Sequence, residues 1–148
     1  MKEIELLFDK VCTEKGLPLD DGLKVIYVFR DTSDKDEKHW IIHEVLYIGK
    51  SIDADGRLNA SHNKIPLAKA KLQKGHFLTF AYCVFHGNVS DETIRMYENA
   101  LLLRTKPSLN RVNVDHYHYE PILIKISGER STLLPDSIKI GDNETENN

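Results

Sequence analysis

The residues with the clearest chemical potential follow an apolar run that ends in a glycine. Val45–Ile48 consists of β-branched, aromatic and aliphatic residues, as expected of a buried strand. Gly49 lets the backbone turn or approach a ligand closely, and Lys50 and Ser51 add a cation and a hydroxyl. Arg57 follows after a turn, and its planar guanidinium matches phosphate oxygens. These types favour an anionic ligand, although an ordinary strand that ends in a surface turn fits the pattern too.

The sequence predicts a β-hairpin that carries this stretch and a third strand beside it. Leu23–Phe29 is rich in β-branched and aromatic residues, with Tyr27 near its end. A polar loop, Asp31–Lys38, separates it from a returning strand, His39–Gly49, and is longer than usual for a hairpin. His76–His86 has the composition of a central strand that is buried on both faces.

Helices are predicted before and after these strands. Lys2–Thr13 has four apolar residues at helical spacing, namely Ile4, Leu7, Phe8 and Val11. We therefore expect an amphipathic accessory helix there. A second helix is expected over Leu67–Lys74, and a third from the N-cap Ser90 to about Thr105. Pro121–Ile126 is predicted to be one more strand.

Composition favours one globular domain. The chain has 148 residues, of which 41% are hydrophobic and 29% charged, enough for one sizeable core. No apolar run reaches the roughly 18 residues that a membrane span needs. Met1–Lys10 is charged and lacks the apolar stretch of a signal peptide, so we expect a cytoplasmic protein without a membrane partner. Cys12 and Cys83 have no metal-ligand spacing and are expected to be buried free thiols.

Charge is distributed unevenly along the chain. The net charge of -3 does not itself indicate a nucleic-acid partner. Between Lys50 and Lys74, however, basic residues outnumber acidic ones by about four. Acidic residues concentrate in 31–44 and in the last residues of the chain. The lysines of 64–74 also fit the solvated face of a helix.

Five short features, in their order and spacing, resemble the catalytic domain of the GIY-YIG nuclease superfamily. They are Val25-Ile26-Tyr27 in one strand, Tyr47-Ile48-Gly49 in the next, Arg57-Leu58 after a turn, Glu98 in a later helix and Lys106-Pro107-Ser108-Leu109-Asn110 after it. The resemblance implies an α/β (α+β) fold with a small central three-stranded antiparallel sheet flanked by helices. We expect this nuclease-like domain over 23–110, an N-terminal accessory helix in 1–22, a packed C-terminal extension over 111–140 and a disordered acidic tail at 141–148.

The resemblance also implies an activity, namely hydrolysis of DNA phosphodiester bonds with one Mg²⁺ or Mn²⁺. Tyr27 and Tyr47 match the paired tyrosines that position or deprotonate the attacking water. Arg57 matches the arginine that contacts the scissile phosphate, and Glu98 the metal ligand. Asn110 matches an asparagine that holds the geometry of the site. A single carboxylate can suffice because Mg²⁺ keeps most of its waters.

Two departures from the family pattern concern the sequence around the site. Val25 replaces the leading glycine of the first motif. The family's histidine or tyrosine commonly follows the arginine by four residues, whereas here Ser61 occupies that position and His62 follows. On a regular helix, His62 would be rotated away from the arginine. We retain His62 as a catalytic candidate and a surface histidine as the alternative.

The remaining expectations concern binding groups and other functions. Lys50 and Ser51 are candidate substrate-binding residues together with Asn110. The histidines that flank strands, His39, His43, His76 and His86, are expected to be structural. One alternative function is a catalytically weak or inactive module of the same family that binds DNA or a protein. The other is a nuclease that acts on RNA.

Overall fold

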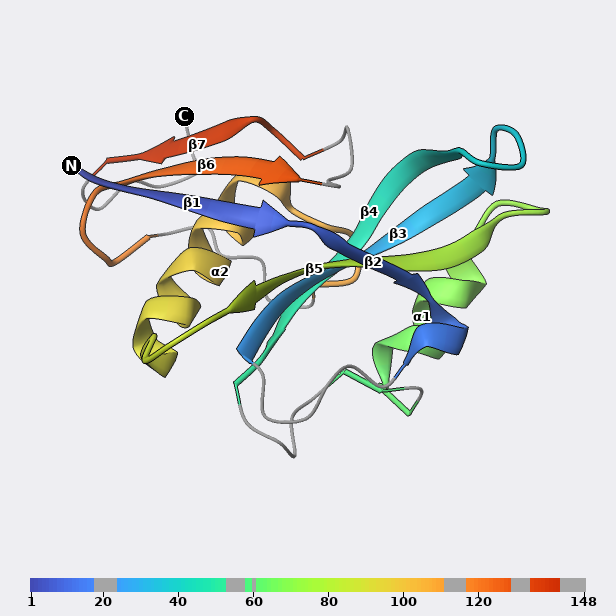
Figure 1. Ribbon diagram of the computed structural model, residues 1–148, viewed down its shortest axis with the longest axis horizontal. Coiled ribbons are helices and arrows are strands. Elements are labelled where there is room, and N and C mark those ends of the chain that lie inside the picture. The colour runs from blue at the N-terminus through green and yellow to red at the C-terminus, as the bar shows by residue number, and fades with distance from the viewer. Residues whose placement is uncertain (18–23, 53–57, 60, 111–116, 129–133, 142–148) are drawn as a thin grey trace.

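The computed structural model shows two β-sheets with a helix packed near each (Figure 1). It describes residues 1–17, 24–52, 58–59, 61–110, 117–128 and 134–141. None of the helices in these ranges is long and apolar enough to cross a membrane. The predicted turn at 53–56, Arg57 and the tail from residue 142 lie outside the described residues.

The larger sheet has the strand order β2-β5-β3-β4 and is antiparallel throughout. Its strands are β2 (Lys10–Thr13), β3 (Lys24–Asp34), β4 (Trp40–Ser51) and β5 (Phe77–Phe85). Strands β3 and β4 form the expected hairpin, in which Tyr27 pairs with Gly49. The register of this hairpin shifts twice, between Phe29 and Arg30 and between Asp31 and Thr32. These irregularities lie between the site-bearing end of the hairpin and its tip.

The smaller sheet joins the two ends of the chain. Strand β1 (Lys2–Phe8) pairs in parallel with β6 (Ile122–Gly128), and β7 (Ser137–Ile140) pairs antiparallel with β6. Only Asp9 separates β1 from β2, so one continuous segment belongs to both sheets (Figure 1). A 3₁₀ turn, η1 (Glu14–Gly16), follows β2.

The two helices cover opposite faces of the larger sheet. Helix α1 (Lys64–Lys71) packs over Phe29 and Phe80. Helix α2 (Asp91–Thr105) belongs to a second core with the small sheet and with Ile26 of β3. Ser90 caps α2 as expected, because its side chain accepts a hydrogen bond from the Thr93 amide.

The predicted fold class is wrong. Among the described residues, the larger sheet has four strands rather than three, and a second sheet replaces the expected accessory helix. Residues 2–13 form strands because Leu6 and Phe8 alternate into the core, while Leu7 between them is 45% exposed. By contrast, β3, β4, β5, β6 and α2 lie where strands and a helix were predicted.

Candidate active site

Tyr27, Tyr47 and His62 meet on the face of the larger sheet that α1 covers. Their ring centroids lie 6.3 Å apart for the tyrosine pair, and 5.7 Å from each tyrosine to His62. Phe29 lies beside all three rings, with centroid distances of 5.2 to 5.7 Å. Residues from β3, from β4 and from the segment before α1 therefore form one aromatic cluster.

Gly49 makes room for the ring of Tyr27. A Cβ atom at position 49 would lie 2.7 Å from both Cζ and Oη of Tyr27. Real carbon atoms do not approach so closely, so any side chain at this position would displace the tyrosine hydroxyl. The glycine is thus explained by the close approach of a site residue to the backbone of the neighbouring strand.

Hydrogen bonds fix the tautomer of His62. Its Nδ1 accepts a hydrogen bond of 3.0 Å from the backbone N–H of Lys64, so Nδ1 carries no proton. The proton of the neutral ring is therefore on Nε2, which lies 2.8 Å from the Tyr27 hydroxyl oxygen. His62 donates and Tyr27 accepts. The phenol proton of Tyr27 is left to point toward another acceptor.

His62 follows Arg57 by one residue more than in the family pattern, and it lies in a turn rather than in a helix. The amide of His62 donates to the carbonyl of Asn59, and the amide of Ile65 donates to that of His62. Helix α1 begins only at Lys64, so the helical rotation expected for His62 does not apply. The histidine consequently reaches Tyr27 despite its displaced position in the sequence.

Burial shifts both tyrosines toward their protonated forms. It raises the pKa of Tyr27 above its usual range, and the nearby Tyr47 and Glu98 raise it further. The pKa of Tyr47 is raised by burial and by the charge of Glu98. Both phenols therefore hold their protons at neutral pH. Removing a proton from either requires additional positive charge nearby.

His62 is expected to stay neutral, which gives a testable pH dependence. Burial, and then the charge of Lys64, lower its pKa below the ordinary 6.5. The unfolded chain therefore binds a proton more readily, and the free energy of unfolding should fall as pH drops below 6.5. Above pH 6.5, the difference in the free energy of unfolding between wild type and His62→Gln should not depend on pH. Below it, wild type should lose stability relative to the variant. NMR titration of the ring and urea unfolding of both proteins measure this; a His62 pKa above 6.5 would contradict it.

Glu98 of α2 and Lys50 of β4 form an ion pair on the face of the larger sheet that α2 covers, because Lys50 pairs with Ile26 in the strand register. Lys50 Nζ lies 2.7 Å from Glu98 Oε1, and the Glu98 side chain is only 11% exposed. Glu98 contributes to the raised pKa values of Tyr27 and Tyr47, which places its charge within reach of both phenols. Lys64 adds a second cation, with Nζ 5.8 Å from the Tyr47 ring centroid.

Glu98 is the carboxylate that was expected to hold a divalent cation, and in the structure its Oε1 accepts a hydrogen bond from Lys50 Nζ. The described residues contain no group of three or more histidine, cysteine, aspartate or glutamate side chains that could hold a metal ion. A divalent ion held by Glu98 alone would need water or substrate oxygens for its other ligands, as Mg²⁺ commonly uses.

The side-chain amide of Asn110 forms hydrogen bonds with both the backbone N–H and the backbone carbonyl of Ile48 in β4. Oδ1 accepts from the Ile48 N–H at 3.1 Å, and Nδ2 donates to the Ile48 carbonyl at 2.8 Å. The amide of Leu109 also donates to the carbonyl of Leu46. Asn110 therefore holds β4 next to the site, and these bonds occupy the groups with which it was expected to bind substrate. Ser51 is buried at the end of β4.

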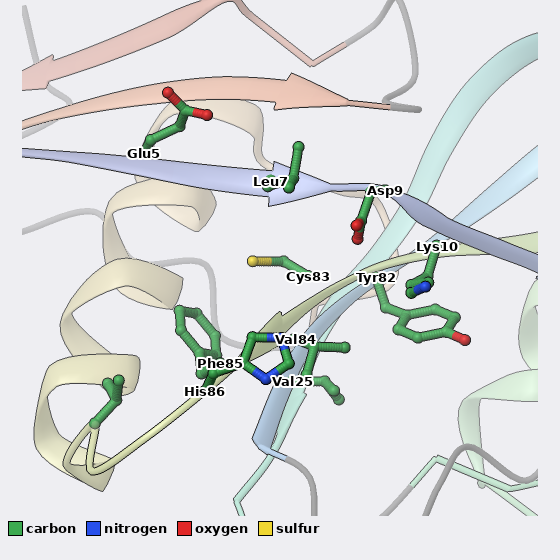
Figure 2. Close-up of a pocket in the computed structure, with 11 residues that line it drawn as sticks. Glu5, Leu7, Asp9, Lys10, Val25, Tyr82, Cys83, Val84, Phe85 and His86 are labelled. Carbon is green, nitrogen blue, oxygen red and sulfur yellow. The ribbon is translucent and has the colours of Figure 1, made fainter.

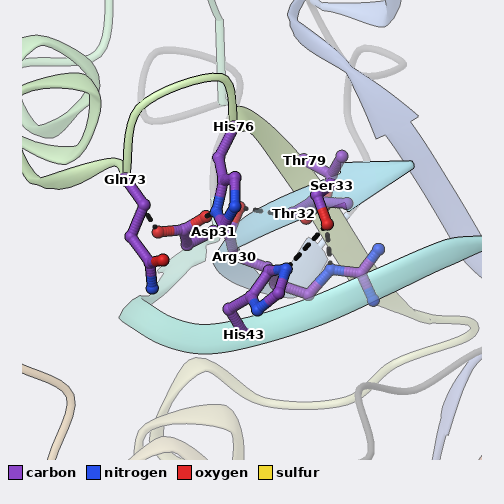
Figure 3. Close-up of polar contacts among 8 residues, drawn as sticks. All are labelled: Arg30, Asp31, Thr32, Ser33, His43, Gln73, His76 and Thr79. Atoms are coloured by element: carbon purple, nitrogen blue, oxygen red, sulfur yellow. Dashed lines mark hydrogen bonds and ion pairs between the residues drawn. The ribbon is translucent and has the colours of Figure 1, made fainter. Parts of the chain in front are cut away.

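A polar cluster that the sequence did not reveal lies farther along β3 (Figure 3). Asp31 is 2% exposed. It accepts hydrogen bonds from His76 Nδ1 at 2.6 Å and from the backbone N–H of Gln73 at 3.2 Å. His43 stacks on His76 at 4.3 Å and contacts Ser33. The cluster ties the segment after α1 to the hairpin. In the sequence, Asp31 was assigned to a polar loop, and nothing in that pattern indicated that it would be buried within β3.

A hollow of about 540 Å³ lies between β1 and β5, and neither Tyr27 nor Tyr47 lines it (Figure 2). Leu7, Val25, Phe85 and Cys83 line it together with the carboxylate of Asp9. Burial raises the pKa of Cys83 to about 11, so its thiol stays protonated. Both cysteines of the chain are free.

Comparisons with models of protein families, with curated proteins and with solved structures found no match to this chain.

Proposed function

We propose that the protein is a metal-dependent DNA endonuclease that hydrolyses phosphodiester bonds. The observation that supports this most directly is the Tyr27–His62 hydrogen bond beside Tyr47, together with the charge of Glu98, which adds to the effect of burial in raising the pKa of both tyrosines. Tyr27, Tyr47 and Glu98 match positions of the pattern that resembles the GIY-YIG nucleases, whereas His62 is displaced from its position by one residue. The proposal rests on the site residues and not on the expected fold.

Tyr27 is the residue that positions the attacking water in this proposal. His62 donates to its oxygen, which stabilises negative charge there if the phenol loses its proton. In the neutral state, the phenol O–H is available to a water or to a phosphate oxygen. Because burial holds the proton on Tyr27, base catalysis needs cations to lower its pKa.

Positive charge at the site comes from Lys50 and Lys64, and from Arg57 as a further proposal. Hydrolysis builds negative charge on the phosphoryl and leaving oxygens, which fixed cations stabilise. Glu98 would hold Mg²⁺ or Mn²⁺, whose charge would stabilise the same oxygens. Asn110 keeps β4, and with it Tyr47 and Lys50, in register with these groups. Residence in the cytoplasm, with access to DNA, is part of the proposal.

Nicking of supercoiled plasmid tests the function. We expect conversion to open circles with Mg²⁺ or Mn²⁺, no conversion with EDTA, and loss of activity in Arg57→Ala because the guanidinium is proposed to contact the scissile phosphate. Structured RNA is the parallel substrate. Salt-sensitive DNA binding without cleavage would identify a binding module instead. Cleavage of RNA alone would replace the DNA assignment.

A further inference from the structure

The ion pair between Lys50 and Glu98 occupies the carboxylate on which the proposed function depends. The two atoms lie 2.7 Å apart, and the side chains are 26% and 11% exposed. A carboxylate this poorly hydrated needs a compensating cation. In the structure, the ammonium of Lys50 supplies that cation.

The side chain of Lys50 can move away from Glu98 without disturbing the fold. Its backbone is fixed by pairing with Ile26 in the β3–β4 ladder. The side chain, by contrast, is an unbranched four-carbon stem that ends in a point charge and reaches solvent. The ammonium can therefore move while the strand, Gly49 and Tyr27 keep their places.

The ammonium of Lys50 and a divalent ion cannot bind Glu98 Oε1 at the same time. An ammonium and a divalent ion repel each other strongly at contact distance in a poorly hydrated site. A divalent ion that binds Glu98 must therefore displace Lys50, and Lys50 must weaken the binding of that ion. Once released, the ammonium stays tethered to β4, the strand that also carries Tyr47.

We propose that Lys50 is a positioning residue that occupies Glu98 until a divalent cation takes its place, and that it then turns to the phosphate of the nucleic acid. This rests on the proposed function. The exchange makes metal and phosphate binding mutually favourable, because the metal releases the cation that the phosphate needs. By linkage, the phosphate strengthens metal binding by the same factor.

Mn²⁺ titration calorimetry on the full chain without nucleic acid tests the exchange. Lys50→Met should bind Mn²⁺ about tenfold more tightly than wild type, because a charge-assisted hydrogen bond no longer competes. Lys50→Arg should restore weaker binding, and Glu98→Gln should abolish it. Lys125→Met removes an exposed cation that pairs with Glu3 on the small sheet, and it should change the affinity by less than about twofold.

NMR of the Lys50 ammonium provides a second readout on wild type. Saturating Mg²⁺ should remove the protection that the bond to Glu98 gives to the Nζ hydrogens. Persistence of that protection, or equal Mn²⁺ affinity in Lys50→Met and wild type, would overturn the exchange. The plasmid assay is separate: exchange without cleavage would refute only the nuclease, and cleavage without exchange only this inference.

Discussion

Glu98→Gln should lower the rate of plasmid nicking by about a thousandfold, the largest effect that we expect from one substitution. The amide keeps the shape of the side chain but carries no charge, so the divalent cation of the proposed function would lose the carboxylate assigned to it. Lys50 keeps a carbonyl oxygen as a hydrogen-bond partner, and the protein should therefore stay folded. Initial nicking rates and circular dichroism of both proteins measure the two effects.

Glu92→Gln is the matched control for this substitution. Glu92 lies on the same helix, but its side chain is 69% exposed and pairs only weakly with Arg95, at 3.9 Å. Its neutralisation should leave nicking within about twofold of wild type, since exposed ion pairs contribute little. Nicking by Glu98→Gln at a similar rate to this control would contradict the role of Glu98 in the reaction.

Gly49→Ala should lower nicking by about a hundredfold, although the substitution adds only a methyl group. The new Cβ would lie 2.7 Å from Oη of Tyr27, so the ring must move away from His62. We also expect the free energy of unfolding to fall by about 1–3 kcal/mol, the usual cost of overpacking. Nicking rates, urea unfolding and the His62 Nε2–H signal in NMR report these changes.

Gly87→Ala is the control that distinguishes an effect of lower stability on nicking from an effect of a displaced Tyr27 ring. Gly87 has a φ of 77°, and a methyl group there meets no atom within 4 Å. Alanine at that position should cost about 1 kcal/mol of backbone strain but leave Tyr27 in place. Its nicking rate should match wild type below the unfolding transition. An unshifted His62 signal in Gly49→Ala would show that the ring did not move.

Local sequence patterns predicted most elements of the larger sheet but not the architecture. The strands around Tyr27 and Tyr47 and the helix capped by Ser90 have strong local signals, and the structure confirms them. The segment Lys2–Phe8 has apolar residues that fit a helix and a strand equally well. Its pairing with Ile122–Gly128 decides the matter, and no local pattern reveals a partner so distant in the chain.

For the site, the sequence predicted candidate residues but not how they touch. The meeting of Tyr27 with His62 depends on a turn that ends just before α1, which the spacing after Arg57 argued against. The contact between Lys50 and Glu98 likewise depends on where α2 packs against β4. Such distances follow from tertiary packing and are not encoded in any short motif.

The pairing of β1 with β6 also sets the order in which the chain can fold. Residues 24–85 supply β3, β4 and β5 within one stretch, so these antiparallel pairs form without waiting for distant partners. Strand β1 is synthesised first but gains its parallel neighbour only after residues 122–128 have left the ribosome. During synthesis, the exposed edge of this strand is therefore the segment that most needs protection from pairing with other chains.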